Sequence, residues 1–366
     1  MKIIHCADLH LDSKMETHLS KEKARERKNE ILITFQNMVE YATKNKVKII
    51  IIAGDMFDKK NISVKAKKIV KNAIEVNPEI DFIYLKGNHD EAGFLDADEE
   101  IPQNLKLFKS EEWTTYEYLD DENPTKITIS GIEFGGKQEY EIYNSLILDK
   151  GKINIVVMHG QESENSVKDK TEIINLKKLK NKNIDYLALG HIHSYKKEKL
   201  DNRGEYCYSG CLEGRGFDEC GDKGFVLLDI KSGKINSEFI KFAQRTLYEI
   251  NIDLTGLTAS NEIEEKIKKE IENIPKSSLV KIILGGETEI GEERDVDFLE
   301  KKFKSYFYYL KIKDNPKIKI DYMKYQNDIS LKGEFIRLVL QQDKLSDDEK
   351  SKVISTGIKA LSGEEF

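Results

Sequence analysis

The sequence predicts an α/β fold, followed by a smaller α+β unit and a helical tail. In roughly the first 240 residues, short apolar runs alternate with amphipathic stretches, which is the pattern of alternating strands and helices. Several runs are apolar throughout, as expected for strands of a sheet that is covered on both faces. The 366 residues are enough for one large domain and one or two small ones.

The apolar runs locate the strands of the large domain, which we place at 1–243. The predicted strands are 2–7, 47–53, 81–86, 127–130, 153–158 and 185–189, with helices at about 20–45, 63–76 and 171–182. After residue 200 the pattern becomes one of hairpins, with strands at 205–209, 225–230 and 235–242. Ser232-Gly233 marks the turn between the last two.

A second domain is predicted at 244–325 and a helical tail at 326–366. The domain contains strands at 246–253, 279–284, 306–312 and 317–323, and helices at about 260–273 and 295–304. In the tail, Ser346 and Glu349 form an S-x-x-E capping box. The last helix carries an apolar stripe of Val353, Ile354, Ile358 and Leu361. This stripe either folds back on its own chain or docks on a partner, and both alternatives stay open.

Composition excludes some classes of protein. The net charge of −7 argues against a uniformly basic nucleic-acid binder, so any surface for nucleic acid must be a local patch. The chain starts without a signal-peptide pattern, and no run approaches the roughly 20 apolar residues of a membrane span. Its four cysteines lack C-x-x-C spacing and are expected to be reduced. We therefore expect a cytoplasmic protein with no membrane contact.

Residues of metal-ligand type follow five of the predicted strands, at the point where each strand ends. These residues are Asp8, His10, Asp55, Asn88, His159, His191 and His193. Because the carboxyl ends of parallel strands meet at one edge of a sheet, we expect these side chains to converge. Glycines before Asp55, Asn88 and His191 allow the backbone to turn sharply there.

These seven residues predict a site for two metal ions. One histidine is more often a core residue than a ligand, as we expect for His5, and one aspartate is more often a turn former. Five strand ends that all carry ligand-type residues are not easily explained by turn chemistry. Imidazole and carboxylate ligands suit Mn²⁺, Fe²⁺ or Zn²⁺, and seven are too many for one such ion. Two ions about 3.5–4 Å apart, bridged by Asp55, could activate water for in-line displacement at phosphorus.

The ligands also spell D-x-H, G-D, G-N-H-D, H-G and G-H-x-H in this order, which resembles the calcineurin-like metallophosphoesterase superfamily. Residues 3–12, 54–58, 208–210 and 223–227 are further similar to DNA-repair nucleases of the SbcD type. The resemblance is strong over 1–230, only architectural over 244–325 and weak beyond. It implies a sandwich of two mixed sheets flanked by helices, a capping domain at 244–325 and a tail that docks on an SMC-like coiled-coil ATPase.

The resemblance also implies roles for single residues. Asp8, His10, Asp55 and His193 would hold one ion, and Asp55, Asn88, His159 and His191 the other. His89 would be the catalytic histidine that contacts the phosphate or protonates the leaving 3′-oxygen, with Asp90 orienting its ring. The ions of such nucleases are usually Mn²⁺, with Mg²⁺, Fe²⁺ or Zn²⁺ as alternatives, and homodimers are common.

This sequence departs from the family pattern at two places. Some relatives carry a histidine shortly after G-D, where Phe57 and Asp58 stand here. The segment 210–217 lacks the proline-rich sequence of many SbcD proteins, which leaves open a divergent subfamily.

Basic residues near the ligands are candidates for contact with DNA phosphates. They are Lys59, Lys60, Lys196, Lys197 and Arg215. The alternative for the lysines is a solvated surface. The aromatic run 306–309 is either core packing in a strand or a platform on which bases stack.

The leading hypothesis is a two-metal DNA exonuclease or endonuclease, acting in DNA repair with the ATPase as partner. Two alternatives are a phosphodiesterase for small molecules such as cyclic nucleotides, and a non-catalytic scaffold. The sequence leaves open the native metal, the polarity of digestion and the oligomeric state.

Overall fold

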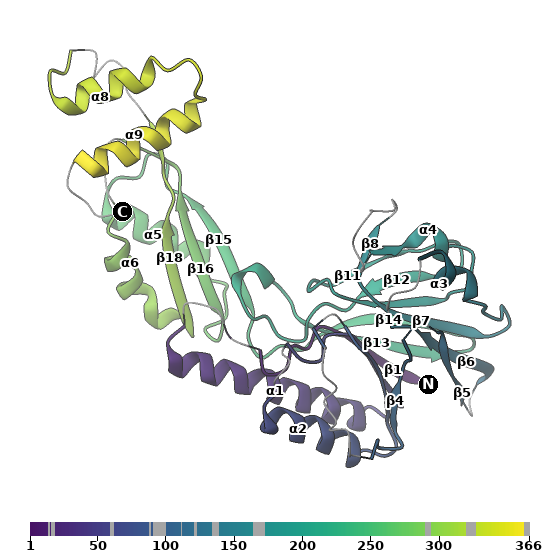
Figure 1. Cartoon of the computed structure of the whole chain (residues 1–366). Coiled ribbons are helices and arrows are strands. Elements are labelled where there is room, and N and C mark those ends of the chain that lie inside the picture. The colour runs from purple at the N-terminus through teal and green to yellow at the C-terminus, as the bar shows by residue number, and fades with distance from the viewer. Residues whose placement is uncertain are drawn as a thin grey trace. The chain divides into compact units, whose positions relative to one another are not determined.

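The chain divides into two compact units, Met1–Thr246 and Leu247–Phe366 (Figure 1). The computed structural model describes residues 1–13, 15, 19–58, 62–87, 89–90, 100–110, 112–120, 123–133, 139–163, 173–289, 294–319 and 327–361. The first unit contains two mixed six-stranded sheets with helices, and the second contains smaller sheets. The predicted fold class is therefore confirmed.

The first sheet has the strand order β14-β13-β1-β2-β3-β4. Its strands are β14 (Lys234–Lys241), β13 (Gly224–Lys231), β1 (Lys2–Cys6), β2 (Ile49–Ala53), β3 (Asp81–Leu85) and β4 (Leu105–Leu107). The four strands from β1 to β4 are parallel, so their carboxyl ends lie at one edge. The hairpin β13–β14 turns at Ser232 and Gly233, whose φ angles of 49° and 75° confirm the predicted turn.

The second sheet has the order β11-β12-β10-β7-β6-β5. Its strands are β11 (Lys196–Lys199), β12 (Glu205–Tyr208), β10 (Tyr186–Gly190), β7 (Ile153–His159), β6 (Asn123–Gly131) and β5 (Thr114–Asp120). Four central strands are parallel and the two edge strands are antiparallel to their neighbours. The strand predicted at 205–209 exists, but its neighbours are β10 and β11 and not the later hairpin.

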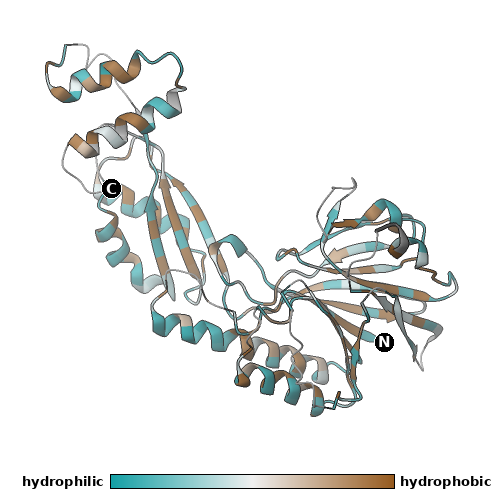
Figure 2. Cartoon of the chain, viewed as in Figure 1, coloured by the Kyte–Doolittle hydropathy of each residue, from teal (hydrophilic) through white to brown (hydrophobic). Residues whose placement is uncertain are grey.

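The two sheets pack face to face, and helices cover their outer faces (Figures 1 and 2). The position of strand β2 explains why its sequence is apolar throughout. Ile49 and Ile51 pack against the second sheet, whereas Ile50 and Ile52 pack under α1 (Lys21–Lys44) and α2 (Val64–Glu75). Since successive side chains of a strand point to opposite faces, a strand buried on both needs an unbroken apolar run.

Ser20 and Ser63 cap the two large helices of the first unit. Each side chain accepts a hydrogen bond from a backbone N–H in the first turn, which satisfies a group that a helix start leaves unpaired. Both predicted helices, 20–45 and 63–76, are confirmed within two residues. On the second sheet, α3 (Glu139–Ser145) and α4 (Leu176–Leu179) pack through Tyr143 and Leu179.

The helix predicted at 171–182 is confirmed only over Leu176–Leu179 and is wrong over the rest of its described part. Ile173–Asn175 form β9, which pairs in parallel with β8 (Gln161–Ser163), and only the four residues of α4 are helical. Asn181 and Asn183 both have positive φ angles, a backbone conformation that cannot continue an α-helix. The helix is short because tertiary pairing and these two asparagines outweigh the helical spacing of its leucines.

The second unit begins with a parallel three-stranded sheet. Its strands are β15 (Leu247–Asp253), β16 (Leu279–Gly285) and β18 (Tyr309–Asp314), and α5 (Ser260–Ile271) and α6 (Val296–Phe303) contribute to the same core. A second, two-stranded sheet pairs β17 (Glu287–Glu289) with β19 (Lys317–Lys319). Most of the aromatic run 306–309 precedes β18. Phe307 is buried in the core, while Tyr306 is partly exposed in the turn η2 (Lys304–Tyr306).

Two helices, α8 (Leu331–Leu340) and α9 (Asp347–Leu361), follow in the second unit. They pack on each other through Ile336, Val339 and Ile354, and α9 also contacts β19. The predicted capping box is confirmed, since Ser346 and Glu349 exchange hydrogen bonds. Of the predicted stripe, Ile354 and Ile358 face α8, whereas Val353 and Leu361 are exposed. The helices thus contact their own chain and still present apolar side chains.

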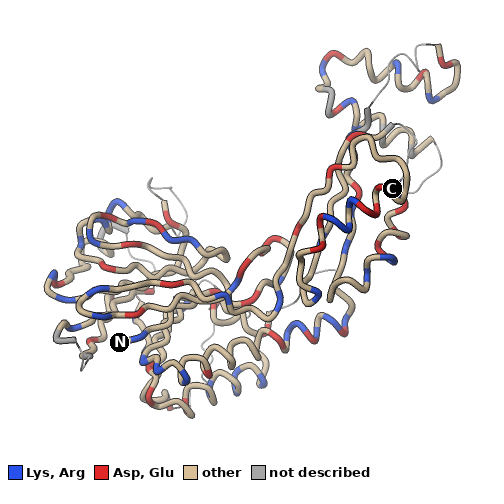
Figure 3. Tube along the Cα trace, turned by 180° about the vertical axis from the view of Figure 1, so that it is seen from behind, with Lys and Arg blue, Asp and Glu red and all other residues tan. Residues whose placement is uncertain are grey.

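Acidic and basic side chains are interspersed along the trace of both units (Figure 3). Many form exposed pairs along helices, such as Lys44 with Glu40 and Lys266 with Glu270. Such pairs contribute about 0–1 kcal/mol each, so they mainly keep the surface hydrophilic. Within the described ranges, none of the helices has both the length and the apolar character needed to cross a membrane.

Candidate metal centre

The loops that follow β1, β2 and β10 have an unusual backbone. Asp8, His10, Asp55 and His191 have φ angles of 51°, 44°, 51° and 101°. Few residues other than glycine adopt such angles, which cost on the order of 1–3 kcal/mol each and cluster at functional sites. Three backbone hydrogen bonds join the first two loops: Asp8 N–H donates to Gly54 O and His10 N–H to Asp55 O, both at 3.0 Å, and Leu11 N–H donates to Met56 O at 2.8 Å.

These loops and the end of β7 bring five predicted ligands into two adjoining groups. One group is Asp8, His10 and His193, and the other is Asp8, Asp55 and His159; within each group the ligand atoms lie within 4.8 Å of one another. Asp8 belongs to both groups. Asp55 Oδ2 also reaches both, at 3.4 Å from His159 Nε2 and 3.9 Å from His10 Nε2. Two carboxylates therefore lie between the groups, where the sequence had suggested Asp55 alone as the bridge.

The donor atoms fit metal ions. His10 Nε2 and His193 Nε2 lie 3.1 Å apart. Two nitrogens that bind the same ion, each at about 2.0–2.1 Å, have a separation of this size. The two groups together offer buried imidazole and carboxylate donors, which is the mixture that borderline transition ions prefer. The residues present therefore suit a pair of divalent ions.

Burial makes the charges of this site depend on one another. Asp8, His10, Asp55 and His159 are at most 4% exposed. Burial raises the pKa of Asp55, but the hydrogen bond and charge of His159 outweigh it and bring that pKa to about 2. Burial lowers the pKa of His159, yet Asp55 raises it to about 9. Asp55 is therefore held in its ionised form, the form that binds cations.

Two of the predicted ligand histidines are oriented by hydrogen bonds on their far side. His159 Nδ1 lies 2.9 Å from Ala53 O, and His193 Nδ1 lies 2.7 Å from Glu219 Oε1. Such contacts fix the ring and its tautomer, so that the Nε2 lone pair points into the site.

His191 and Asn88 differ from the other predicted ligands. The backbone N–H of His191 donates to both oxygens of Asp8, at 2.9 and 3.0 Å, and its ring lies edge-on to that of His159. Its ring nitrogens belong to neither group. Asn88 lies outside the described residues.

The three glycines before ligands are needed for different reasons. Gly54 has a φ of 95°, as the predicted sharp turn requires, and a Cβ there would lie 2.0 Å from His159 Nδ1. Gly87 and Gly190 are required for space instead. A Cβ would lie 2.2 Å from Asp55 Oδ1 at Gly87 and 1.9 Å from Ala53 O at Gly190.

Asp90, the residue expected to orient His89, is engaged by the backbone. Asp90 accepts hydrogen bonds from the backbone N–H groups of Met56, Phe57 and Gly87, at 2.9–3.1 Å, so its carboxylate braces two loops. The carboxylate that faces the His89 ring is Asp58, whose Oδ1 lies 3.3 Å from His89 Nδ1. The same oxygen lies 3.3 Å from His10 Nδ1. Asp58 thus connects a predicted ligand with the predicted catalytic histidine.

The predicted phosphate contacts are engaged with neighbouring residues. Lys196 Nζ lies 2.6 Å from Glu162 Oε1, and Lys197 Nζ donates to Ser237 Oγ at 3.0 Å. Arg215 is mostly buried and pairs with Glu219 at 2.8 Å. Lys59 and Lys60 lie outside the described residues.

Sequence reasoning missed the supporting role of Asp58 and Glu219. Asp58 had a signal, because it follows the G-D motif by three residues. Glu219 had none, since it lies 26 residues after His193 in the turn η1 (Phe217–Glu219).

Comparison with known proteins identifies the family. The family model described as calcineurin-like phosphoesterase matches residues 1–195, which include every predicted ligand. The chain belongs to this family. Among similar proteins is the uncharacterized metallophosphoesterase YhaO of Bacillus subtilis, 28% identical over 78% of this chain and 72% of its own length.

Two further relatives of this phosphoesterase carry nuclease or repair names. One is a component of the nuclease SbcCD of Staphylococcus epidermidis, 26% identical over 75% of this chain and 77% of its own length. The DNA double-strand break repair protein Mre11 of Saccharolobus solfataricus is 27% identical over 97% of this chain and 93% of its own length. The similarity to Mre11 therefore extends through the second unit.

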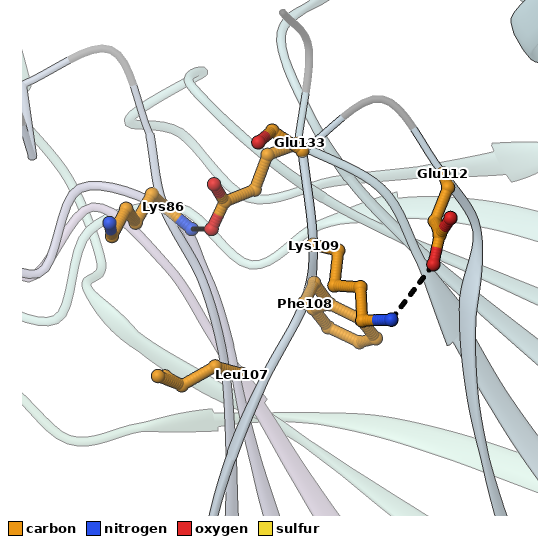
Figure 4. Close-up of a pocket in the computed structure, with 7 residues that line it drawn as sticks. Lys86, Leu107, Phe108, Lys109, Glu112 and Glu133 are labelled. Atoms are coloured by element: carbon orange, nitrogen blue, oxygen red, sulfur yellow. Dashed lines mark hydrogen bonds and ion pairs between the residues drawn. The ribbon is translucent and has the colours of Figure 1, made fainter.

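A separate pocket of about 520 Å³ lies at the carboxyl ends of β3 and β4 (Figure 4). Phe108 and Leu107 line it together with Lys86 and Lys109, and Lys109 pairs with Glu112. Its described lining contains none of the predicted ligands. The charged side chains that line the pocket are two lysines and two glutamates, so the pocket is not part of the predicted metal site.

Proposed function

We propose that this phosphoesterase is a two-metal DNA nuclease. The observation that carries the proposal is the convergence of buried aspartates and histidines from four strand ends into two groups that share Asp8. Asp8, His10, Asp55 and His193 would hold one ion. Asp55, Asn88, His159 and His191 would hold the other. When bound, the ions supply an activated water and stabilise the charge that develops on the phosphate, and Mn²⁺ is the metal we expect.

His89 is proposed to deliver the proton. Its side chain is 47% exposed, unlike the buried histidines beside it, so it can reach a substrate outside the metal groups. With Nδ1 facing Asp58, its Nε2 is free to contact the phosphate or protonate the leaving 3′-oxygen. The carboxylate of Asp58 can accept a hydrogen bond from Nδ1, which orients the ring for this proton transfer.

DNA as substrate rests on the relatives. Two of the relatives described above are named as part of a nuclease and as a double-strand break repair protein, and the Mre11 relative matches nearly the whole chain. The second unit is proposed as the capping domain, and α8 and α9 as the segment that docks on an SMC-like coiled-coil ATPase. The exposed Leu338, Val353 and Leu361 supply apolar surface for such docking.

One observation favours the second candidate, a phosphodiesterase for small molecules. Lys196 is neutralised by Glu162 and Lys197 is held by Ser237, so the described part of the rim offers fewer free cations than the sequence suggested. A small phosphodiester needs no extended basic surface, whereas a DNA strand benefits from one.

The test compares two substrates. The purified chain is incubated with Mn²⁺ and either labelled single- and double-stranded DNA or a small chromogenic phosphodiester, as wild type, His89→Ala and Asp55→Ala. We expect DNA to be cleaved by the wild type, cleavage to fall about 10²–10⁴-fold in His89→Ala, and to be lost in Asp55→Ala. Hydrolysis of the small ester with intact DNA would refute the nuclease proposal in favour of the second candidate. Two bound ions without hydrolysis of either substrate would indicate a scaffold.

A further inference from the structure

Arg215 lies between the two carboxylates that contact the histidines of the metal centre. Its Nε and Nη2 donate to Glu219 Oε1 at 3.1 and 2.8 Å, and its Nη1 lies 3.6 Å from Asp58 Oδ2. Nη1 also donates to Ser13 Oγ at 3.4 Å, and that hydroxyl donates to Asp58 Oδ2 at 2.7 Å. One guanidinium thus spans both carboxylates.

Glu219 in turn fixes His193. Its Oε1 lies 2.7 Å from His193 Nδ1, and its Oε2 accepts the backbone N–H of Arg215 at 2.7 Å. Arg215 Nη2 lies 3.4 Å from the same His193 nitrogen. With Nδ1 occupied in this way, Nε2 of His193 is the nitrogen that faces His10.

Asp58 lies close to two histidines on the other side. One of its oxygens lies 3.3 Å from Nδ1 of both His10 and His89, while the other is the oxygen that Ser13 and Arg215 approach. A displacement of Asp58 would therefore disturb a ligand and the proposed proton donor together.

The loop that carries Arg215 is itself fixed by the fold. The carbonyl of Gly214 accepts a hydrogen bond from Arg27 Nη2 at 2.9 Å, and Arg27 is completely buried in α1. On the other side of Arg215, the turn η1 brings Glu219 back toward it. The guanidinium is thus placed by contacts that exist independently of any substrate.

We propose that Arg215 is a positioning residue, which holds Glu219 and Asp58 in place and through them sets the rings of His193, His10 and His89. A planar guanidinium is suited to this because its fork can serve two carboxylates at once, which a lysine ammonium does with less precision. The side chain is only 19% exposed, so little of it is available to a DNA phosphate. The inference rests on the proposed metal centre but not on the choice of DNA as substrate.

The experiment measures Mn²⁺ binding by calorimetry, without any substrate. The variants are Arg215→Gln, Arg215→Lys, Glu219→Gln and the double variant Arg215→Gln/Glu219→Gln. Arg203→Gln is the matched control, because Arg203 also pairs with a carboxylate, Asp185, at 2.8 Å, away from the ligands. We expect Arg215→Gln and Glu219→Gln each to weaken one of the two Mn²⁺ affinities about 10–100-fold. The control should bind like the wild type, and Arg215→Lys should be intermediate.

The double variant separates positioning from a general loss of stability. If Arg215 acts through Glu219, the two substitutions are not additive, and the double variant binds Mn²⁺ about as weakly as the weaker single one. Additive losses, together with a lower melting temperature in EDTA, would contradict the proposal. If Arg215→Gln does not fold, the variants Arg215→Lys and Glu219→Gln test the proposal instead. Wild-type Mn²⁺ affinity in both of them would overturn the positioning role of Arg215.

A DNA-binding measurement distinguishes the phosphate-contact alternative. Binding of single-stranded DNA in EDTA is followed over a range of salt concentrations. We expect the same dependence on salt for Arg215→Gln and the wild type. A slope reduced by about one phosphate contact, with unchanged Mn²⁺ affinity, would show that Arg215 contacts DNA instead. Failure of the chain to cleave DNA would leave the Mn²⁺ result intact, so the two proposals can fail separately.

Discussion

At the scale of single residues, the site depends on backbone conformations that most side chains avoid. The backbones of Asp8, His10 and Asp55 have positive φ angles, in the left-handed region. Hydrogen bonds between the loops after β1 and β2 stabilise these conformations. Such conformations persist only where the surrounding structure determines them. The convergence of the ligands is therefore a property of the folded loops as much as of the side chains.

Gly54→Ala tests how tightly the loop after β2 is packed against a ligand. The new Cβ would lie 2.0 Å from His159 Nδ1, so the ring must move and Mn²⁺ affinity should fall at least about 10-fold. Gly221→Ala is the control, because Gly221 has a nearly equal φ of 91° with nothing within 4 Å. The control should lose about 1–2 kcal/mol of unfolding free energy and keep its Mn²⁺ affinity. Equal Mn²⁺ affinities in the two variants would contradict the close packing.

Asp58→Asn and Asp90→Asn should affect different properties. Asp58 faces His89, so Asp58→Asn is expected to lower kcat about 10–100-fold. Asp90 accepts three backbone N–H groups, so Asp90→Asn should lower the free energy of unfolding by about 1–3 kcal/mol. Urea unfolding and steady-state kinetics measure both. Full activity of Asp58→Asn would show that a group other than Asp58 orients the ring of His89.

The residues that were predicted and those that were missed differ in what determines their position. Asp8, Asp55 and His159 directly follow apolar strands, so local sequence and the geometry of parallel sheets were enough to bring them together. Glu219 reaches His193 only through the turn η1, far along the chain. Asp90 looked like the partner of His89 because it is the next residue, but its carboxylate turns to backbone N–H groups.

At the scale of elements, the same distinction separates central strands from edges. Strands β1, β2 and β7 were predicted because a strand buried on both faces has an unmistakable apolar run. Strand β11 was missed because its sequence is Lys-Lys-Glu-Lys and it exists only through pairing with β12. No local signal distinguishes such a charged edge strand from a loop.

Helix α1 is joined to later parts of the first unit by a buried ionic network. Arg27 pairs with Glu30 and, at 3.1 Å, with Glu213, and Arg245 pairs with Glu30 at 2.7 Å. Thr34 donates to Glu213 at 2.8 Å. The network fixes the end of the first unit, at Arg245, and the loop before Arg215 to one helix.

Arg27→Met should therefore be strongly destabilising. It removes the cation that faces the buried carboxylate of Glu213, which then keeps only uncharged donors such as Thr34, at a cost of about 3–5 kcal/mol. Lys44→Ala, on the same helix, is the control; its pair with Glu40 is 70% and 60% exposed, and its loss should cost less than about 1 kcal/mol. Urea unfolding compares the two. Equal small effects would mean that the network contributes little.

At the scale of the whole molecule, the two units have separate cores. The ligand groups lie entirely within Met1–Thr246, while the second unit has its own core around Ile267, Ile282 and Phe303. From its length alone we expected the chain to form more than one domain. The roles of the second unit as a cap and of α8 and α9 as a docking segment remain predictions, because both depend on partners.

Deletion of residues 327–366 tests whether the first unit binds metal without the tail and whether the tail docks on the ATPase. We expect Mn²⁺ affinity and hydrolysis of a small phosphodiester to remain within about twofold of the wild type, because no ligand is removed. Co-purification of a coexpressed coiled-coil ATPase should be lost. Loss of Mn²⁺ binding on truncation would show instead that the tail supports the first unit, and an unchanged ATPase complex would place docking elsewhere.

We propose that one chain binds two metal ions through ligands that share Asp8 and Asp55. The most direct measurement is the number of Mn²⁺ ions bound per chain, determined by equilibrium dialysis and elemental analysis for the wild type, Asp8→Ala and Asp55→Ala. We predict two ions in the wild type and fewer than one in each variant, since both carboxylates lie between the two groups. A single ion in the wild type, or two ions still bound in either variant, would contradict the binding of two ions through shared carboxylates.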